Sequence, residues 1–413
     1  MRKVNRDLKY YKILKSIEKL CKISNPEIGD IVDRALSGRE LYREDCIKML
    51  SSDDPVDIEL LRLCADYVRW ILCDDYVTFV CNRNINFTNV CVIGCKFCSY
   101  SVPPDSPRGY VYTIDEVRRK VLEGLKVYGI TEVCLQGGIN PKLGLDYYIK
   151  ILNCIKSIDS KIHIHAFSPQ EIYYISVREG IKIRELLKIL RENGLDSIPG
   201  TAAEILHDDV RKTICPNKIS TSKWIEIIKE AHSLGIRTTC TIMYGHVESV
   251  EHVAHHLDIL KNIQKETGGF TELVLLPYIH YNTRLYRECD CRPGSSSIYD
   301  IKICATSRIY LAPYIKNIQV SWVKLGRKFA QYLLTCGAND LGGTLIEEHI
   351  SHAAGAFERY MISREEFIEL IINIDRIPAE RTTLYKIIRV YYQSGNKSSI
   401  ISGTTGSSLS TVC

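Results

Sequence analysis

The chain has 413 residues, of which 45% are hydrophobic and 25% are charged, as in an ordinary soluble globular protein. Its net charge is only +5, and basic residues are interspersed with acidic ones, so no basic stripe indicates a nucleic-acid partner. No apolar run approaches the roughly 20 residues of a membrane span, and neither an apolar core nor a cleavage site follows the basic start, so we expect a cytoplasmic protein without a membrane partner.

Apolar residues at helical spacing over residues 57–72 predict an N-terminal helical region, which we place at residues 1–75. A strand is expected at 77–81, and a group of cysteines lies in the loop that follows. Thr113 and Glu116 form a capping box that opens the next helix. A short strand then ends at a pair of glycines.

From there the chain alternates between strands and helices. Helices are predicted at residues 145–158, 183–193, 223–234, 250–266 and 300–311, and strands at 132–135, 162–167, 237–244, 272–276 and 318–322. Strands alternating with helices of this length indicate βαβ units and a parallel sheet. We predict an α/β fold with a full or partial TIM-type (β/α) barrel of residues 76–345. A C-terminal helical extension is expected at 346–393, and a disordered Ser-, Thr- and Gly-rich tail at 394–413.

Seventeen cysteines are present, an odd and irregularly spaced set that argues against a disulfide framework. Most of them, such as Cys64, stand in hydrophobic stretches and are expected to be small buried side chains. Cys91, Cys95 and Cys98 differ, because all three fall close together in one loop.

The spacing of these three cysteines lets one loop place three thiolates around a corner of a 4Fe-4S cluster. The fourth iron would then have no protein ligand, and an open iron site is where chemistry becomes possible. Two other interpretations remain: a zinc site that lacks a ligand, or three cysteines packed in the core. Zinc sites usually have a second pair of ligands, and none follows nearby, so the cluster is the favoured prediction.

With Phe97 before the third cysteine, this spacing resembles the radical S-adenosylmethionine superfamily. The resemblance implies that the open iron chelates S-adenosylmethionine and that one electron from the cluster releases a 5′-deoxyadenosyl radical. It also implies that a glycine-rich strand end receives the methionine amino group, a position that Gln136, Gly137 and Gly138 match. The acidic residue often found after these glycines is missing, so backbone carbonyls are expected to bind the amine. Phe97 and these three residues are therefore expected to bind the cofactor.

Longer motifs narrow the resemblance. Residues 82–91, 163–169, 197–206 and 242–248 look like a small group of radical enzymes. The group comprises two futalosine-pathway menaquinone enzymes and the tyrosine-using, CofH-type subunit of deazaflavin (F0) synthase. Pro199-Gly-Thr-Ala-Ala-Glu204 and the segment 336–345 favour the F0 synthase subunit. The match covers roughly residues 75–390 and has one cluster motif, which indicates the separate subunit rather than a fused two-barrel enzyme.

The resemblance implies that the radical abstracts a hydrogen from L-tyrosine, whose Cα–Cβ bond then breaks to give a 4-hydroxybenzyl radical and 2-iminoacetate. The benzyl radical adds to 5-amino-6-(D-ribitylamino)uracil, giving 5-amino-5-(4-hydroxybenzyl)-6-(D-ribitylimino)-5,6-dihydrouracil. A second F0 synthase subunit, of the CofG type, and a low-potential electron donor are the implied protein partners. A menaquinone-pathway radical enzyme remains the alternative within the same class, and a non-catalytic iron–sulfur or zinc protein is the alternative outside it.

Such polar substrates need hydrogen-bonding side chains at the strand ends, where Ser168, Glu171, His246 and Asn282 fall. Glu204 is expected to bond the ribose or methionyl group of the cofactor and Arg211 to bind its carboxylate, with a helix-start salt bridge as the alternative. Glu248 is a further cofactor-binding candidate. The candidate catalytic residues are His163, His165, His280 and Asn339. His163 and His165 alternate on one strand, so their side chains share a face. That face can point into the barrel interior, or the two can be core histidines whose hydrogen bonds are satisfied within the chain.

Two further pairs of residues are weaker candidates for metal binding than the three cysteines. His349 and His352 are one helical turn apart, but no third ligand is evident, and a helix face near the substrate pocket is the preferred interpretation. Cys289 and Cys291 are interpreted as incidental thiols on a mobile loop, and the resemblance gives them no role.

Overall fold

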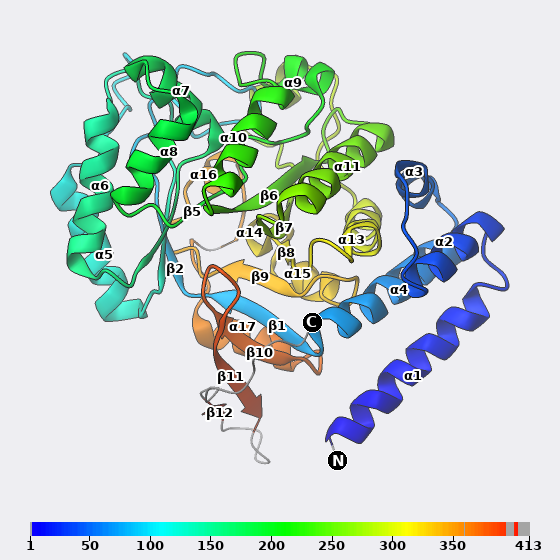
Figure 1. Ribbon diagram of the computed structural model, residues 1–413. Coiled ribbons are helices and arrows are strands. Elements are labelled where there is room, and N and C mark those ends of the chain that lie inside the picture. Colours follow the sequence, from blue (N-terminus) through cyan, green and yellow to red (C-terminus); the bar gives the residue numbers. More distant parts are fainter. Residues whose placement is uncertain (1, 359, 394–399, 404–413) are drawn as a thin grey trace.

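The computed structural model describes residues 2–358, 360–393 and 400–403. A curled sheet lies at the centre, helices cover its outside, the N-terminal helices lie along one side, and the last strands extend from one end (Figure 1). None of the helices in the described part of the chain is both long and apolar enough to cross a membrane.

The N-terminal region is helical, as expected. It consists of α1 (Arg2–Leu20), α2 (Pro26–Leu36), α3 (Arg43–Ser51) and α4 (Pro55–Cys73). Asp54 caps α4, because its carboxylate accepts a hydrogen bond from Val56 N at 2.7 Å, and Pro55 takes the first helical position, where no amide hydrogen is needed. Helix α4 packs against α13 (Ser297–Leu311) and so attaches this region to the barrel.

Parallel strands form the barrel wall. They are β1 (Tyr76–Val80), β2 (Asn82–Ile85), β3 (Glu132–Leu135), β4 (His163–Ala166), β5 (Ser197–Ile198), β6 (Arg237–Tyr244), β7 (Phe270–Pro277), β8 (Ile318–Val320) and β9 (Asp340–Gly343). Strands β2 to β9 pair in sequence order, and only Cys81 separates β1 from β2. Because β1 pairs with β9 while β2 pairs with β3, the sheet curls back on itself and closes. The predicted TIM-type barrel is confirmed.

Helices between the strands cover the barrel. They are α5 (Ile114–Glu123) with a π-helical turn η1 (Gly124–Tyr128), α6 (Leu145–Ile158), α7 (Pro169–Glu179), α8 (Ile183–Glu192), α9 (Asp208–Ile214), α10 (Thr221–Ser233), α11 (Val250–Thr267), α12 (Arg284–Glu288), α13, α14 (Trp322–Leu325) and α15 (Arg327–Leu333). The predicted capping box of α5 is present, since Thr113 N donates to Glu116 at 2.7 Å and Glu116 N donates to Thr113 Oγ1 at 3.2 Å. Helix α8 buries Leu186, Leu187 and Leu190 on one face, which is what helical spacing of apolar residues produces.

The C-terminal region begins with two helices, as expected, and then adds strands that the sequence did not predict. The helices are α16 (Ile350–Ala354) and α17 (Arg364–Ile372), and the strands are β10 (Ile377–Arg381), β11 (Ile387–Gln393) and β12 (Ile400–Gly403). Strand β10 runs parallel to β1, and β11 and β12 follow it antiparallel. The predicted disordered tail is therefore wrong at residues 400–403, and its other residues lie outside the described part of the chain.

The turn between β10 and β11 closes the barrel at the amino-terminal ends of its strands. Thr383 Oγ1 donates to Glu132 at 2.6 Å, and the Tyr385 hydroxyl donates to Glu272. Arg381 Nε donates to Asp340 at 2.6 Å. We call Arg381, Thr383 and Tyr385 the floor of the barrel, because each bonds a carboxylate near the start of a barrel strand.

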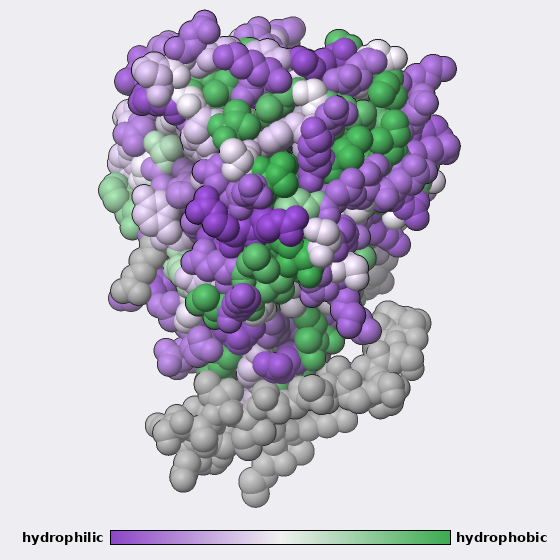
Figure 2. All heavy atoms as spheres, turned by 90° about the vertical axis from the view of Figure 1, so that its left-hand side faces the viewer, coloured by the Kyte–Doolittle hydropathy of each residue, from purple (hydrophilic) through white to green (hydrophobic). Residues whose placement is uncertain are grey.

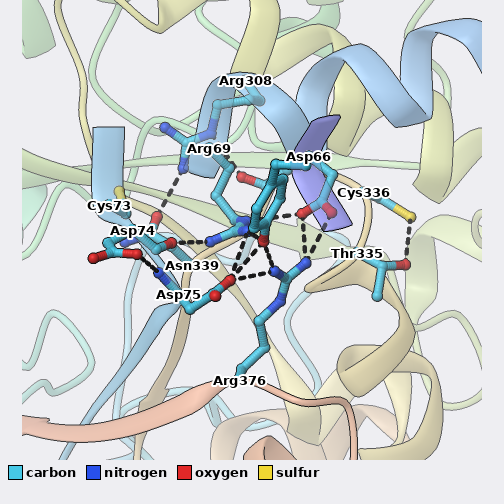
Figure 3. Close-up of polar contacts among 12 residues, drawn as sticks. Asp66, Arg69, Cys73, Asp74, Asp75, Arg308, Thr335, Cys336, Asn339 and Arg376 are labelled. Carbon is cyan, nitrogen blue, oxygen red and sulfur yellow. Dashed lines mark hydrogen bonds and ion pairs between the residues drawn. The ribbon is translucent and has the colours of Figure 1, made fainter. Parts of the chain in front are cut away.

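A buried network of charges joins the N-terminal helices to the sheet (Figure 3). Arg376 lies just before β10, and its guanidinium donates to both carboxylate oxygens of Asp66 on α4 at 2.8 Å. It also donates to Asp75 at 2.7 Å and to the hydroxyl of Tyr10 on α1. Arg69 donates to Asp66 at 2.8 Å. Buried charges are tolerated only when they are paired, so this network fixes the places of three distant segments.

Exposed apolar side chains are scattered over the surface. The face shown in Figure 2 is a mosaic in which hydrophilic areas interrupt smaller hydrophobic ones. Val127 and Val177, which expose 66% and 62% of their surface, are two of the most exposed aliphatic residues. Scattered exposure of this kind is normal for soluble proteins and indicates no broad docking face in this view.

Replacing Arg376 with Met should lower the free energy of unfolding by about 3–5 kcal/mol, because Asp66 and Asp75 would be left buried without their cation. Denaturant unfolding measures this change. Lys229→Met is the matched control, since the Lys229–Glu266 pair is exposed and its loss should leave stability unchanged. Equal stability of the two variants would contradict a structural role for the network.

Candidate active site

A cavity of about 400 Å³ occupies the inside of the barrel. Alternate residues of several strands line it, as the two-residue period of a strand requires: Glu132 and Cys134 on β3 with Gln136 just after it, Thr239, Thr241 and Met243 on β6, and Glu272, Val274 and Leu276 on β7. The cavity begins at the cysteine loop, beyond the carboxyl ends of the strands, and reaches Arg381 and Thr383 of the floor. Active sites of (β/α) barrels lie at the carboxyl ends of the strands, so this cavity is the candidate active site.

The three cysteines of the loop after β2 all line this cavity, as the cluster prediction requires. Gly94 has a φ of 65°, a left-handed conformation that turns the chain between Cys91 and Cys95. Cys91 N donates to Val102 O at 2.9 Å, which ties the start of the loop to a later segment. Among the described residues no three His, Cys, Asp or Glu side chains meet as ligands of one metal ion. A 4Fe-4S cluster needs thiolates spread around it instead, and three cysteines along one cavity wall fit that need.

A partly buried lysine that the sequence did not point to lies at the same end of the cavity. Lys218 Nζ donates to Glu204 at 2.5 Å and lies 5.2 Å from the centre of the Phe97 ring. Burial raises the pKa of the Cys95 thiol, and the nearby Lys218 ammonium acts against this rise. A positive charge here favours thiolates and an anionic cluster. Lys218 follows α9 in an irregular loop without a recognisable motif, so only the folded chain shows its position.

The glycine pair after β3 lies directly against the cysteine loop. A Cβ atom on Gly138 would be 2.2 Å from Val90 O and 2.9 Å from the Cβ of Cys91. A Cβ atom on Gly137 would be 2.5 Å from the ring of Phe87. Gln136 and both glycines line the cavity, as predicted for cofactor-binding residues. The structure adds that only glycine allows this strand end to approach the cysteine loop so closely.

Glu171 connects the ends of β3 and β4. Its carboxylate accepts hydrogen bonds from Gly137 N at 3.2 Å and from Ser168 N at 2.7 Å. Burial raises the pKa of Glu171 to about 7, so the carboxyl group of this cavity residue titrates near neutral pH. The sequence placed Glu171 at a strand end without giving it a role.

Of the three charged residues predicted to bind the cofactor, only Glu204 lines the cavity. Its φ of 44° is a left-handed conformation that side chains rarely adopt, and such strain is typical of functional loops. Arg211 instead donates to Ala203 O at 2.6 Å and Ile219 O at 3.1 Å, so its guanidinium holds two loops together. Glu248 accepts from Gly245 N at 2.7 Å and His246 N at 2.9 Å and caps the turn after β6. Neither Arg211 nor Glu248 lines the cavity, and their contact with the cofactor stays a prediction.

Of the four candidate catalytic residues, only His165 lines the cavity. His163 and His165 both bond Ser197 Oγ at 2.7 Å, which confirms that they share a face, but His163 does not line the cavity. His280 stacks on Tyr281, with 4.1 Å between ring centroids, outside the cavity lining. Asn339 Oδ1 accepts from Arg308 at 2.7 Å in the network of Figure 3. Its sequence position suggested a strand end, but the side chain holds the end of α13 against β8 and β9.

The remaining pairs also lie outside the cavity lining. His349 only precedes α16, while His352 is within that helix and has its ring 4.0 Å from that of Tyr360, so the two do not form a metal-binding helix face. Cys289 packs beside the cysteine loop, since Lys96 Nζ lies 3.3 Å from its Sγ. All sixteen cysteines at described positions are free, which agrees with the expected absence of a disulfide framework there.

Burial keeps the interior histidines neutral. It lowers the pKa of His165 to about 3, with a further contribution from Arg381, and it lowers the pKa of His256 to about 3. A neutral His165 offers the cavity a hydrogen-bonding group without a positive charge. Burial has the opposite effect on a carboxyl group and raises the pKa of Glu272, which lines the same cavity.

Comparisons with known proteins agree with this geometry. Residues 85–260 match the family model described as the radical SAM superfamily, and residues 267–393 match the CofH/MqnC C-terminal region. A 5-amino-6-(D-ribitylamino)uracil–L-tyrosine 4-hydroxyphenyl transferase of Methanocaldococcus jannaschii is 49% identical over 85% of this chain and 98% of its own. The Archaeoglobus fulgidus protein of the same name is 48% identical over 82% of this chain and 97% of its own.

Solved structures share the fold. Methylornithine synthase (PylB) covers 84% of this chain and 97% of its own, with a TM-score of 0.67 and 18% identity. HydG, a maturase of the [FeFe]-hydrogenase, covers 91% of this chain and 81% of its own, with a TM-score of 0.69 and 16% identity. At these identities the likeness concerns the fold alone.

Replacing Gly138 with Ala should displace the cysteine loop, because the added Cβ would meet the Val90 carbonyl at 2.2 Å. We expect anaerobically reconstituted G138A to hold less than half the iron and sulfide of the natural chain. Gly29→Ala is the control, since its Cβ would make only ordinary contacts of 3.5 Å. Full iron and sulfide in G138A would show that the close approach is dispensable.

The neutral histidines predict a loss of stability in acid. In the unfolded chain a histidine gains its proton as the pH falls below about 6.5, whereas His256 stays neutral in the folded chain down to about pH 3. This contribution to stability is thus full above pH 6.5 and declines below it. The free energy of unfolding of the natural chain should therefore fall between pH 6 and pH 4. In His256→Gln the slope of this fall should be smaller than in the natural chain, by up to about 1.4 kcal/mol per pH unit. Equal slopes for the two proteins would contradict a neutral His256.

Proposed function

The chain belongs to the 5-amino-6-(D-ribitylamino)uracil–L-tyrosine 4-hydroxyphenyl transferase family of the radical SAM superfamily. We propose that it cleaves L-tyrosine and transfers the 4-hydroxybenzyl group to 5-amino-6-(D-ribitylamino)uracil in the synthesis of coenzyme F0. The observation that carries this proposal is an identity of 49% over 85% of the chain, a span that includes the barrel with its cysteine-lined cavity.

Cys91, Cys95 and Cys98 would hold the 4Fe-4S cluster, because they line one wall of the cavity and leave one iron without a protein ligand. When bound, the cluster and S-adenosylmethionine supply a 5′-deoxyadenosyl radical by one-electron reductive cleavage. Gly137 and Gly138 offer backbone carbonyls beside the cysteine loop, and Lys218 adds positive charge there.

Glu204 is the acidic side chain best placed for the hydroxyl or amino groups of S-adenosylmethionine. It lines the cavity, its backbone has a left-handed φ of 44°, and Lys218, whose Nζ lies 2.5 Å from the carboxylate, orients it. Phe97 lies on the other side of Lys218 and provides an apolar surface at the same end of the cavity. These contacts support Glu204 and Phe97 as cofactor-binding residues, in contrast to Arg211 and Glu248.

The deeper part of the cavity suits a polar second substrate. Its lining there carries hydrogen-bonding groups from several strands and from the floor: Asn82, Glu132, His165, Thr239, Glu272, Gln319 and Thr383. A ribityl chain has several hydroxyl groups and a pyrimidine ring has carbonyl and amino groups, so a wall of neutral and acidic hydrogen-bonding side chains can satisfy both. We infer that the diaminouracil occupies this deeper part.

The reaction also implies proteins outside this chain. We infer that the hydroxybenzyl adduct passes to a second F0 synthase subunit of the CofG type. We also infer that a low-potential electron donor supplies the cluster. A reducing cytoplasm suits the oxygen-sensitive cluster and the many free cysteines. Co-purification with the second subunit would support direct transfer between the two enzymes.

The assay of this function is anaerobic incubation of the reconstituted protein with a reductant, S-adenosylmethionine, L-tyrosine and the diaminouracil. We expect 5′-deoxyadenosine and the 4-hydroxybenzyl adduct in equal amounts. Cofactor cleavage without consumption of tyrosine would overturn the proposal. A futalosine derivative and an enolpyruvylbenzoate serve as alternative substrates, and turnover of either would assign the menaquinone pathway instead.

Replacing Cys95 with Ala tests the cluster separately. The natural chain should hold about four irons and four sulfides, whereas C95A should lose the cluster and at least 100-fold of its activity, because a ligand is missing. Cys240→Ala is the matched control, since Cys240 is buried away from the cavity. Bound zinc with little iron in the anaerobically prepared natural chain would favour the non-catalytic alternative.

A further inference from the structure

Three basic residues line the cavity: Lys218, Lys324 and Arg381. Two of them are committed to carboxylates of the chain. Lys218 Nζ donates to Glu204 at 2.5 Å, and Arg381 donates twice to Asp340, at 2.6 and 3.0 Å. The side chain of Lys324 has no hydrogen bond or ion pair with any residue that the structure describes.

The position of Lys324 is fixed by its neighbours. It lies in α14, the single helical turn that follows β8, and its backbone amide donates to Ser321 O at 3.1 Å. The adjacent Trp322 is buried and its indole nitrogen donates to Gly343 O at 3.0 Å, which anchors the turn to β9. Ser321, Val323 and Lys324 all face the cavity near the carboxyl ends of the strands, where the reacting groups meet.

The surroundings of Lys324 are poor in compensating charge. Burial lowers the pKa of its ammonium group, and Glu348 is the carboxylate that acts against this. Glu348 lines the cavity and forms no ion pair with Lys324; its carboxylate accepts from Ile350 N at 3.0 Å and Ser351 N at 3.0 Å. A partly buried cation that faces the cavity without a partner in the described chain is free to bind an anionic ligand there.

Lys324 lies apart from Lys218, the cation that is expected near the cofactor. Lys218 belongs to the segment between α9 and α10 and acts on Cys95 of the cysteine loop. Lys324 follows β8, on a different part of the barrel wall. Of the two other ligands of the proposed reaction, the diaminouracil has no carboxylate, whereas tyrosine is a zwitterion. Lys324 and the neighbouring Glu348 present opposite charges that match it.

We propose that Lys324 binds the α-carboxylate of the amino-acid substrate and so determines that the substrate is a free amino acid. This assignment rests on the proposed function and names the part of the cavity that holds tyrosine. A charge-assisted bond of this kind places Cα and its amino group near Glu348, with the phenol ring extending along the cavity.

The test compares ligands that differ in the carboxylate alone. Binding of L-tyrosine and L-tyrosinamide to the reconstituted holoenzyme with S-adenosylmethionine is measured by anaerobic calorimetry. The natural chain should bind tyrosine about 10- to 100-fold more tightly than the amide. In Lys324→Met the two affinities should become equal through weaker binding of tyrosine, and Lys324→Arg should restore part of the preference. The affinity for S-adenosylmethionine should not change.

Lys328→Met is the matched control, because Lys328 is exposed on the adjacent helix α15, outside the cavity lining. Equal binding of tyrosine and its amide by the natural chain would overturn the inference, whether or not K324M folds. Loss of affinity for S-adenosylmethionine in K324M would overturn it too, by assigning Lys324 to the cofactor. If the natural chain cleaves tyrosine without preferring it to the amide, the proposed function stands and only this inference fails.

Discussion

Closure of the barrel by residues 76–85 is the constraint on which the rest of the structure depends. One extended segment pairs with β9 at its start and with β3 at its end, and Asn82 lies where the two pairings meet. Its side-chain amide donates to Glu132 at 2.8 Å, while its oxygen accepts from Leu345 N at 2.9 Å. A Cβ on Gly343 would be 2.1 Å from that oxygen, so the contact leaves no room for a larger residue. Without this closure the interior would be an open sheet face, and no enclosed cavity would exist.

Charges inside the molecule divide into two kinds. The first kind forms ion pairs within the chain, such as Arg376 with Asp66 and Arg381 with Asp340. The second lies on the cavity wall and keeps bonding capacity for a ligand, as Glu204 and Lys324 do. The difference follows from cost, because an unpaired buried charge is tolerated only where binding or catalysis compensates for it.

Features encoded by neighbouring residues could be predicted from the sequence. The cysteine triplet, the glycine pair and the α5 capping box are local patterns, and the alternation of strands and helices was enough for the barrel. Lys218 could not be found, because its partners come from other loops. Arg211 and Asn339 were misplaced because their position at strand ends does not reveal that backbone and side-chain partners already occupy them. Strand β10 was missed because buried charges such as Glu380 and Arg381 look like surface residues in sequence.

The closed floor has a kinetic consequence. Thr383 and Tyr385 bond the carboxylates at the amino-terminal end of the barrel, so ligands reach the cavity from the end that carries the cysteines. A molecule in the depth of such a cavity must enter before the molecules nearer the mouth and leave after them. With the diaminouracil at its proposed place in the depth, we expect the acceptor to bind before S-adenosylmethionine, which shortens the time in which a radical could form with nothing to receive it.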